Sequence, residues 1–147
     1  MSETLEVPVL TVGRASLADI GESPWLVARI AEHWVTTPGH AMGWLRSSLD
    51  INDQALVRCG PAFGMAHVEY GRMGSPNRVV IDFVIAKGKD EDTDAMVAVF
   101  GWFETWAKRL GCSGLFRVDD FTDCDRSWIV HRLGRLSVRQ MRHAIFV

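Results

Sequence analysis

The 147-residue sequence has one tyrosine, three cysteines and no apolar run of the length that a membrane-spanning helix requires. The cysteines, Cys59, Cys112 and Cys124, form no CxxC pair, and their odd number argues against a disulfide framework or a zinc ribbon. The first residues carry neither the basic region nor the apolar stretch of a secretory signal peptide. We therefore expect reduced thiols, a cytoplasmic rather than secreted protein, and no membrane partner.

An excess of either charge is also lacking. The chain has 16 basic and 18 acidic side chains, which gives a formal net charge of -2. Nucleic-acid-binding domains usually carry a clear basic excess, so no nucleic-acid partner is expected. The hydrophobic share is 48%, and the chain has the length of one ordinary domain. A single domain over residues 1–147 is therefore predicted.

Apolar residues recur at helical spacing in three parts of the chain. Ser23 and Pro24 supply an N-cap and a first helical residue, so a helix is predicted over residues 24–34. A shorter helix is predicted over residues 39–49. The clearest helix covers residues 93–110, with acidic side chains at its start and basic ones in its last turn, as the helix dipole favours.

Five segments have the composition of strands. They cover residues 7–12, 55–59, 63–70, 78–85 and 114–118. A helix starting at Thr122 and one or two closing strands within residues 136–147 complete the predicted order β-α-α-β-β-β-α-β-α-β. The long helix crosses between the fourth and fifth strands, which predicts that these two strands are parallel. The fold class expected is α/β with a mixed sheet.

The long helix ends in the sequence AKRLG at residues 107–111, and a strand follows it directly. The next predicted helix ends in LG at residues 133–134. This order of elements and this local pattern resemble the core of the GNAT N-acetyltransferase superfamily over residues 55–138. The resemblance implies the GNAT-like acyl-CoA N-acyltransferase fold, and it assigns an acetyl-CoA site to the loop between the central strand and the long helix.

In that family the loop is rich in glycine, and its backbone N–H groups cradle the pyrophosphate of coenzyme A at a helix N-terminus. Here the loop reads KGKDEDTD over residues 87–94, with acids at or near the two glycine positions, Asp90 and Asp92. It carries two positive and four negative charges, and like charges in contact repel by about 1 kcal/mol per pair in water. We therefore predict a degenerate loop and expect no cofactor. Should acetyl-CoA bind, the resemblance assigns its contacts to Lys87, Gly88, Lys89 and Thr93.

The family often uses a tyrosine in the last helix as the acid that protonates the leaving thiolate. The matching position here is near Val130, with His131 beside it, and the single tyrosine, Tyr70, belongs to another element. The resemblance demands no particular general base, because a strand carboxylate or a water often serves. Asp82 and Glu69 are the candidates for that role in this sequence.

No metal site is predicted. The acids of residues 90–94 suit Mg²⁺ or Ca²⁺ chemically, but their spacing is not that of an EF-hand, and a solvated helix start is expected instead. His33, His40 and His67 lie on three different elements. Cys124 and His131 share a helix face but are two turns apart, about 10 Å, which is too far for direct proton transfer.

The damaged loop and the short chain resemble the degenerate acetyltransferase-like proteins that tailed bacteriophages carry in their virions. We therefore predict a non-catalytic structural or interaction protein of that type, cytoplasmic or virion-associated. Six tryptophans would support contacts in a homo-oligomer or larger assembly. The basic side chains after residue 134 form either a charged sheet edge or a docking surface for an acidic protein. The alternative function is an acetyl-CoA-dependent N-acetyltransferase that acts on an unidentified amine.

Overall fold

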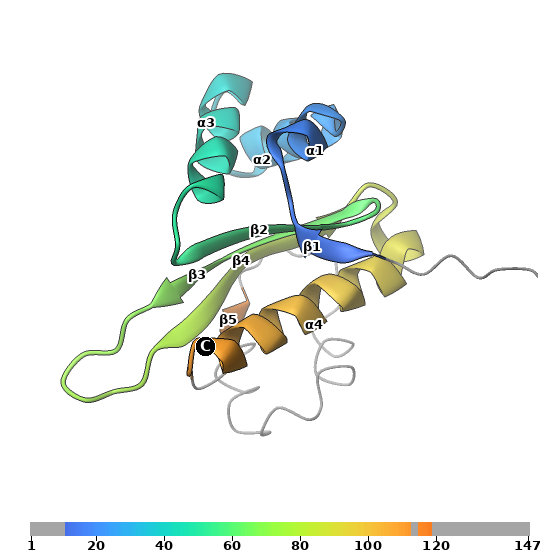
Figure 1. Ribbon diagram of the computed structural model, residues 1–147. Helices are drawn as coiled ribbons and strands as arrows, with labels where there is room; N and C mark the ends of the chain where they lie inside the picture. Colours follow the sequence, from blue (N-terminus) through green and yellow to red (C-terminus); the bar gives the residue numbers. More distant parts are fainter. Residues whose placement is uncertain (1–10, 113–114, 119–147) are drawn as a thin grey trace, which may run out of the picture.

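Over the described residues, a five-stranded mixed sheet forms the middle layer (Figure 1). The computed structural model describes residues 11–112 and 115–118. The strands lie in chain order, β1-β2-β3-β4-β5, and the first four are antiparallel. β5 pairs with β4 in parallel, which confirms the predicted crossover. The bounds are Val12–Arg14 for β1, Gln54–Cys59 for β2, Ala62–Glu69 for β3, Arg78–Ala86 for β4 and Leu115–Val118 for β5.

Helices cover both faces of the sheet (Figure 1). One face carries three helices, α1 over Leu17–Gly21, α2 over Pro24–His33 and α3 over Pro38–Leu49. The opposite face carries α4 over Thr93–Arg109, and the 3-10 turn η1, Lys89–Asp92, leads into it. α2, α3 and α4 match the predicted helices to within one residue at each end.

Two apolar cores follow from these layers, and β4 contributes to both. Val84 and Ala86 belong to the core beneath α4, whereas Phe83 and Ile85 pack toward α2 and α3. Because β4 is covered on both faces, it reads as a nearly continuous apolar run, as predicted. Asp82 is the one acidic residue within the strand.

Gly64 on β3 allows α4 to pack close to the sheet. A Cβ atom at this position would lie 2.5 Å from Val99 Cγ1 and 2.7 Å from Phe103 Cε2. Both of those side chains are fully buried. No side chain larger than a hydrogen therefore fits between β3 and α4 here.

Two predictions at the start of the chain need correction. The first strand covers Val12–Arg14 and overlaps the predicted 7–12 only at Val12, while residues 1–10 lie outside the described part. The helix α1 was not predicted. Its signal is a capping box, in which the Ser16 hydroxyl accepts from the Asp19 N–H and the Asp19 carboxylate accepts from the Ser16 N–H.

The helix predicted from Thr122, the closing strands, Cys124 and His131 lie outside the described residues. Within the ranges 11–112 and 115–118, no helix combines the length and apolar character that crossing a membrane requires.

Candidate functional site

The junction between β4 and α4, where the resemblance places a coenzyme, is a tight turn whose backbone N–H groups are hydrogen-bonded within the protein. The Lys87 N–H donates to Pro61 O at 3.0 Å, and the Glu91 N–H donates to Gly88 O at 3.2 Å. The Gly88 N–H donates to Asp92 Oδ2 at 2.6 Å. Three of the N–H groups of this junction are therefore engaged within the protein.

Asp92 lies where an anion would approach the turn. A Cβ atom at Gly88 would be 2.6 Å from Asp92 Oδ2, so the glycine is needed for the carboxylate to come this close. A carboxylate oxygen and a phosphate oxygen seek the same kind of backbone donor. A phosphate at Gly88 would therefore have to displace Asp92.

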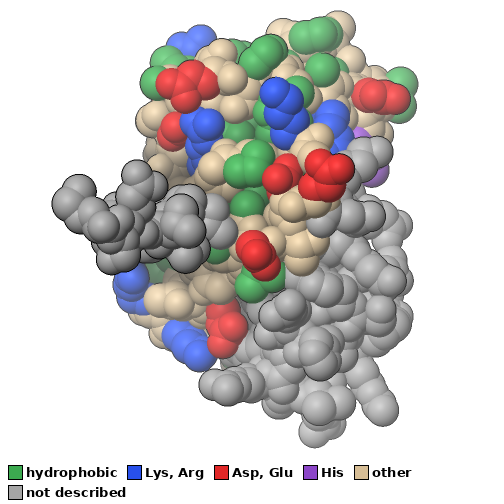
Figure 2. Space-filling view, turned by 90° about the vertical axis from the view of Figure 1, so that its right-hand side faces the viewer, with side chains coloured by type: hydrophobic (Ala, Val, Ile, Leu, Met, Phe, Trp, Pro, Cys, Tyr) green, Lys and Arg blue, Asp and Glu red, His purple; other side chains and the backbone are tan. Residues whose placement is uncertain are grey.

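The four predicted coenzyme contacts lie close together along the chain at this end of the sheet. Lys87 is exposed directly after β4, Gly88 precedes η1, Lys89 begins η1 and Thr93 is the first residue of α4. Figure 2 looks onto this end of the molecule, where acidic and basic side chains are interspersed on the described surface.

Asp82 occupies a bulge in the middle of β4. Met65 pairs with Phe83 and Ala66 pairs with Ile81, so Asp82 is the extra residue in the ladder. A bulge redirects the side chain it carries. The Asp82 carboxylate lies 3.0 Å from His67 Nδ1, and both side chains are partly exposed.

The described part of the ladder between β4 and β5 joins Val79 to Leu115 and Val80 to Arg117. Its last pair, among the described residues, joins Ile81 to Val118.

Glu69 lies at the opposite end of β4 from the junction. It pairs with Arg78 across the ladder, and its Oε1 is 3.2 Å from Arg78 Nη2. At about 3.3 Å per residue, roughly 25 Å of strand separates this ion pair from Ala86. The structure thus separates the two predicted carboxylates, and Asp82 is the nearer of them to the junction.

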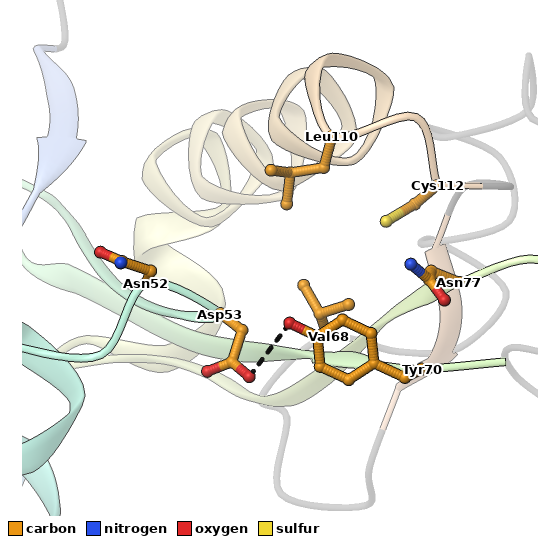
Figure 3. A pocket seen from close by; sticks show the side chains of 7 residues that line it. All are labelled: Asn52, Asp53, Val68, Tyr70, Asn77, Leu110 and Cys112. Atoms are coloured by element: carbon orange, nitrogen blue, oxygen red, sulfur yellow. Dashed lines mark hydrogen bonds between the residues drawn. The ribbon is translucent and has the colours of Figure 1, made fainter.

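Tyr70 also lies at that far end, beside the C-terminus of α4 (Figure 3). Its hydroxyl donates to Asp53 Oδ2 at 3.3 Å on the wall of a hollow of about 250 Å³. Cys112 lines the same hollow, and burial raises the pKa of its thiol. Because a raised pKa keeps the thiol protonated, Cys112 is poorly suited to act as a nucleophile.

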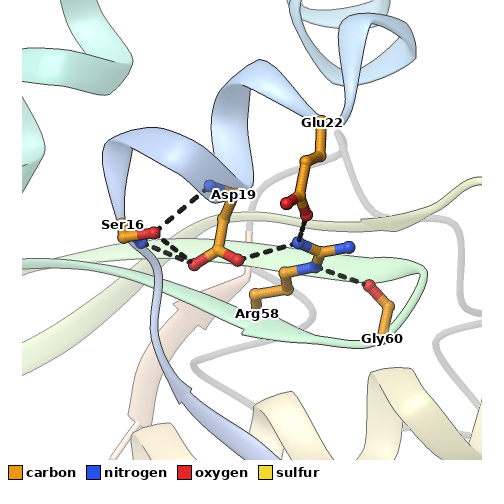
Figure 4. A network of polar contacts seen from close by, with 5 residues as sticks. All are labelled: Ser16, Asp19, Glu22, Arg58 and Gly60. Atoms are coloured by element: carbon orange, nitrogen blue, oxygen red, sulfur yellow. Dashed lines mark hydrogen bonds and ion pairs between the residues drawn. The ribbon is translucent and has the colours of Figure 1, made fainter.

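An ionic network ties α1 to β2 (Figure 4). Arg58 Nη1 lies 2.8 Å from Asp19 Oδ1 and 3.0 Å from Glu22 Oε2, and its Nε donates to Gly60 O at 2.9 Å. These contacts were not predicted, because the network joins residues almost forty positions apart. The pKa of the Asp19 carboxyl is lowered, first by the hydrogen bond from the Ser16 N–H and then by that from Arg58.

This network predicts a loss of stability in acid. Because the pKa of Asp19 in the folded state lies below its ordinary value of 3.8, its stabilising contribution is present above that pH and is lost as the pH falls through the folded-state pKa. We expect Asp19→Asn to unfold more easily than the parent chain at neutral pH, with the difference shrinking below about pH 4. Urea unfolding of both proteins between pH 2.5 and 7 measures this difference, and a gap that stays constant with pH would contradict it.

Comparison with known proteins reveals likeness in structure only. No protein-family model and no curated protein matches the sequence. A probable acetyltransferase of known structure superposes with a TM-score of 0.69 at 10% identity, over 85% of this chain and 89% of that one. The aminoglycoside 6'-N-acetyltransferase AAC(6')-Ig from Acinetobacter haemolyticus gives a TM-score of 0.64 at 14% identity, over 84% of this chain and 88% of that one.

A transcriptional regulator from Bacillus halodurans gives a TM-score of 0.67 at 13% identity, over 88% of this chain and 95% of that one. Likeness at such low identity shows the shared fold and leaves the activity open. It confirms the α/β fold class that the sequence predicts. The chain is a mixed α/β domain with the fold of the GNAT acetyltransferases.

Proposed function

We propose that this protein is an acetyl-CoA-dependent N-acetyltransferase that acts on an amine. The observation that carries the proposal is the pairing of His67 with Asp82 at the bulge of β4, on the strand that leads into the turn at Gly88. This arrangement belongs to a fold that the chain shares with acetyltransferases.

The coenzyme would supply the activated acetyl group. Lys87, Gly88, Lys89 and Thr93 would hold its phosphates, with Lys87 and Lys89 as the cationic partners. Gly88 fits this role because it already admits one anionic oxygen, that of Asp92, to its N–H group. Rotation of the Asp92 side chain would release that donor to a phosphate oxygen.

His67 and Asp82 would take the proton from the amine. In the neutral imidazole, Nδ1–H donates to the Asp82 carboxylate at 3.0 Å, which makes Nε2 the basic nitrogen. The carboxylate also stabilises the imidazolium that forms when Nε2 accepts a proton. The His67 side chain is 34% exposed and that of Asp82 is 22% exposed.

A second candidate is a non-catalytic structural or interaction protein of the bacteriophage virion type, with protein partners or copies of itself. The contact between Asp92 and Gly88 favours it, because the chain itself fills a donor that the coenzyme would use. Two exposed apolar side chains would serve as contact points, Val35 between α2 and α3 and Trp44 on α3.

Substitution of Asp92 separates the two candidates. We expect Asp92→Ala to bind acetyl-CoA about tenfold more tightly than the parent, because it frees the Gly88 N–H and removes one negative charge. Isothermal titration calorimetry measures the affinity. Asp94→Ala is the matched control, since it removes the same charge from the exposed first turn of α4 and no hydrogen bond to Gly88.

If neither the parent nor Asp92→Ala binds acetyl-CoA at millimolar concentration, the enzyme proposal is wrong and the non-catalytic candidate replaces it. An equal gain in both variants would mean that charge alone, and not the Gly88 donor, limits binding.

A further inference from the structure

A second hollow lies between the corner of α1 and α2, the turn from β2 to β3, and the residue that follows β4. Its volume is about 480 Å³, and its walls include Ser23, Trp25, Arg58 and Lys87. At about 30 Å³ for each water molecule, this is room for roughly sixteen water-sized groups. A ligand of the size of a small aromatic acid fits such a space.

Two cationic side chains, Arg58 and Lys87, line this hollow, and each has a donor that bonds to none of the described residues. Arg58 uses Nε and Nη1 for its contacts with Gly60, Asp19 and Glu22, while its Nη2 bonds to none of the described residues (Figure 4). Lys87 forms no ion pair with any residue in the described ranges. Guanidinium and ammonium donors of this kind favour an oxyanion.

Ser23 adds a buried polar group on the same wall. The residue is 3% exposed and occupies the N-cap position of α2, yet its hydroxyl makes no capping bond. The Ser23 hydroxyl has no hydrogen-bond partner among the described residues, although the backbone of Ser23 bonds to Ile20 and Leu26. Ser48, the other polar residue of the described core, donates to Leu45 O at 2.6 Å. Ser23 lines the hollow, so its hydroxyl can bond to a ligand oxygen there.

The remaining wall includes an aromatic side chain and an exposed carboxylate. Trp25 is half-buried and packs edge-on against Phe63, with ring centroids 5.9 Å apart. Glu22 lies at the rim with its side chain 66% exposed, so solvent screens its ion pair with Arg58. An anion can therefore compete with Glu22 for the guanidinium, while Trp25 offers a face to the apolar part of the ligand.

We propose that this hollow binds a small molecule with a carboxylate or phosphate group, held by Arg58, Lys87 and Ser23, whose apolar body lies against Trp25. This binding site is additional to the proposed acetyl transfer. It shares Lys87 with the predicted coenzyme contacts, but Ser23 and Trp25 belong to the α1–α2 side and take no part in them.

Nuclear magnetic resonance titration with benzoate, phenyl phosphate and the neutral benzyl alcohol tests the proposal. We expect at least one of the two anions to shift the Trp25 indole N–H signal in a saturable way, and benzyl alcohol to leave it unchanged. The anion that binds more tightly identifies the oxyanion that the hollow prefers. The proposal is overturned if neither anion shifts the signal, or if benzyl alcohol binds as well as the anions do.

Variants then assign the contacts. Ser23→Ala and Lys87→Gln should each weaken binding of the preferred anion by about tenfold, the usual effect of losing one hydrogen bond to a charged group. Lys108→Gln is the matched control, because Lys108 is an exposed lysine of α4 whose Nζ pairs with Glu104. Arg58 is left unchanged, since its removal would also break the contacts to Asp19 and Glu22.

Acetyl-CoA affinity is measured in the same variants, so that this proposal and the proposed function can fail separately. Loss of anion binding in Ser23→Ala with unchanged acetyl-CoA affinity supports a separate site. Equal loss of both in Ser23→Ala would show that the hollow is part of the coenzyme site, which would overturn the proposal. Anion binding without any acetyl-CoA binding would remove the proposed function alone.

Discussion

An Asp82→Asn variant is expected to lose acetyl transfer by about 10²- to 10⁴-fold, the range typical of removing a general acid–base group. The amide keeps the shape of the side chain but cannot stabilise a protonated His67 as the carboxylate does. Because Asp82 lies at the bulge, away from the Gly88 turn, the affinity for acetyl-CoA should stay as in the parent. Steady-state transfer to a panel of primary amines, together with calorimetric titration, measures both quantities.

Glu69→Gln is the matched control for Asp82→Asn. It removes one carboxylate from the same sheet, at the ion pair with Arg78 on the far end of β4. We expect no comparable loss of rate from it. A similar loss in both variants, or a loss in Glu69→Gln alone, would show that the His67–Asp82 pair is not the base.

A Gly64→Val variant is expected to lose at least about 3 kcal/mol of unfolding free energy, at or above the upper end of the usual overpacking cost. The added Cβ would lie closer to Val99 and Phe103 than van der Waals contact allows, and both of those side chains are fully buried. Chemical denaturation followed by tryptophan fluorescence measures the change.

Gly101→Ala in α4 should change stability in the opposite direction. A Cβ atom at Gly101 would meet nothing within 4 Å, and the position is inside a helix. Alanine is favoured over glycine there by up to about 1 kcal/mol.

If Gly64→Val were as stable as the parent chain, α4 would not be packed on β3 as the structure has it.

The core of the fold could be predicted because the pattern of hydrophobic residues in the sequence matches the burial of those residues in the structure. β4 is covered on both faces, and from Val79 to Ala86 it is apolar except at Asp82, so its composition alone indicates a central strand. α4 has a wide apolar face, and Gly111, with φ of 70°, ends it. The predicted bounds of β1 were wrong because a three-residue edge strand has too few residues for a hydrophobic pattern to define its ends.

The site could be predicted only in part. The run of acids in residues 87–94 indicated that the loop was unusual, but the contact of Asp92 with Gly88 depends on the 3-10 turn η1, which has no clear sequence signal. The pairing of His67 with Asp82 depends on a bulge that shifts the register of two strands. The sequence alone does not show which side chains the strand register brings together, because the register is known only from the structure of the sheet.

The most direct test of the proposed function is whether acetyl-CoA reaches the turn after β4. Addition of acetyl-CoA to the ¹⁵N-labelled protein should shift the amide signals of Gly88 and Thr93 in a saturable manner, and Asp92→Ala should reach saturation at a lower concentration. Unchanged signals from both residues at millimolar acetyl-CoA, in the parent and in Asp92→Ala alike, would contradict the proposal that this chain is an acetyltransferase.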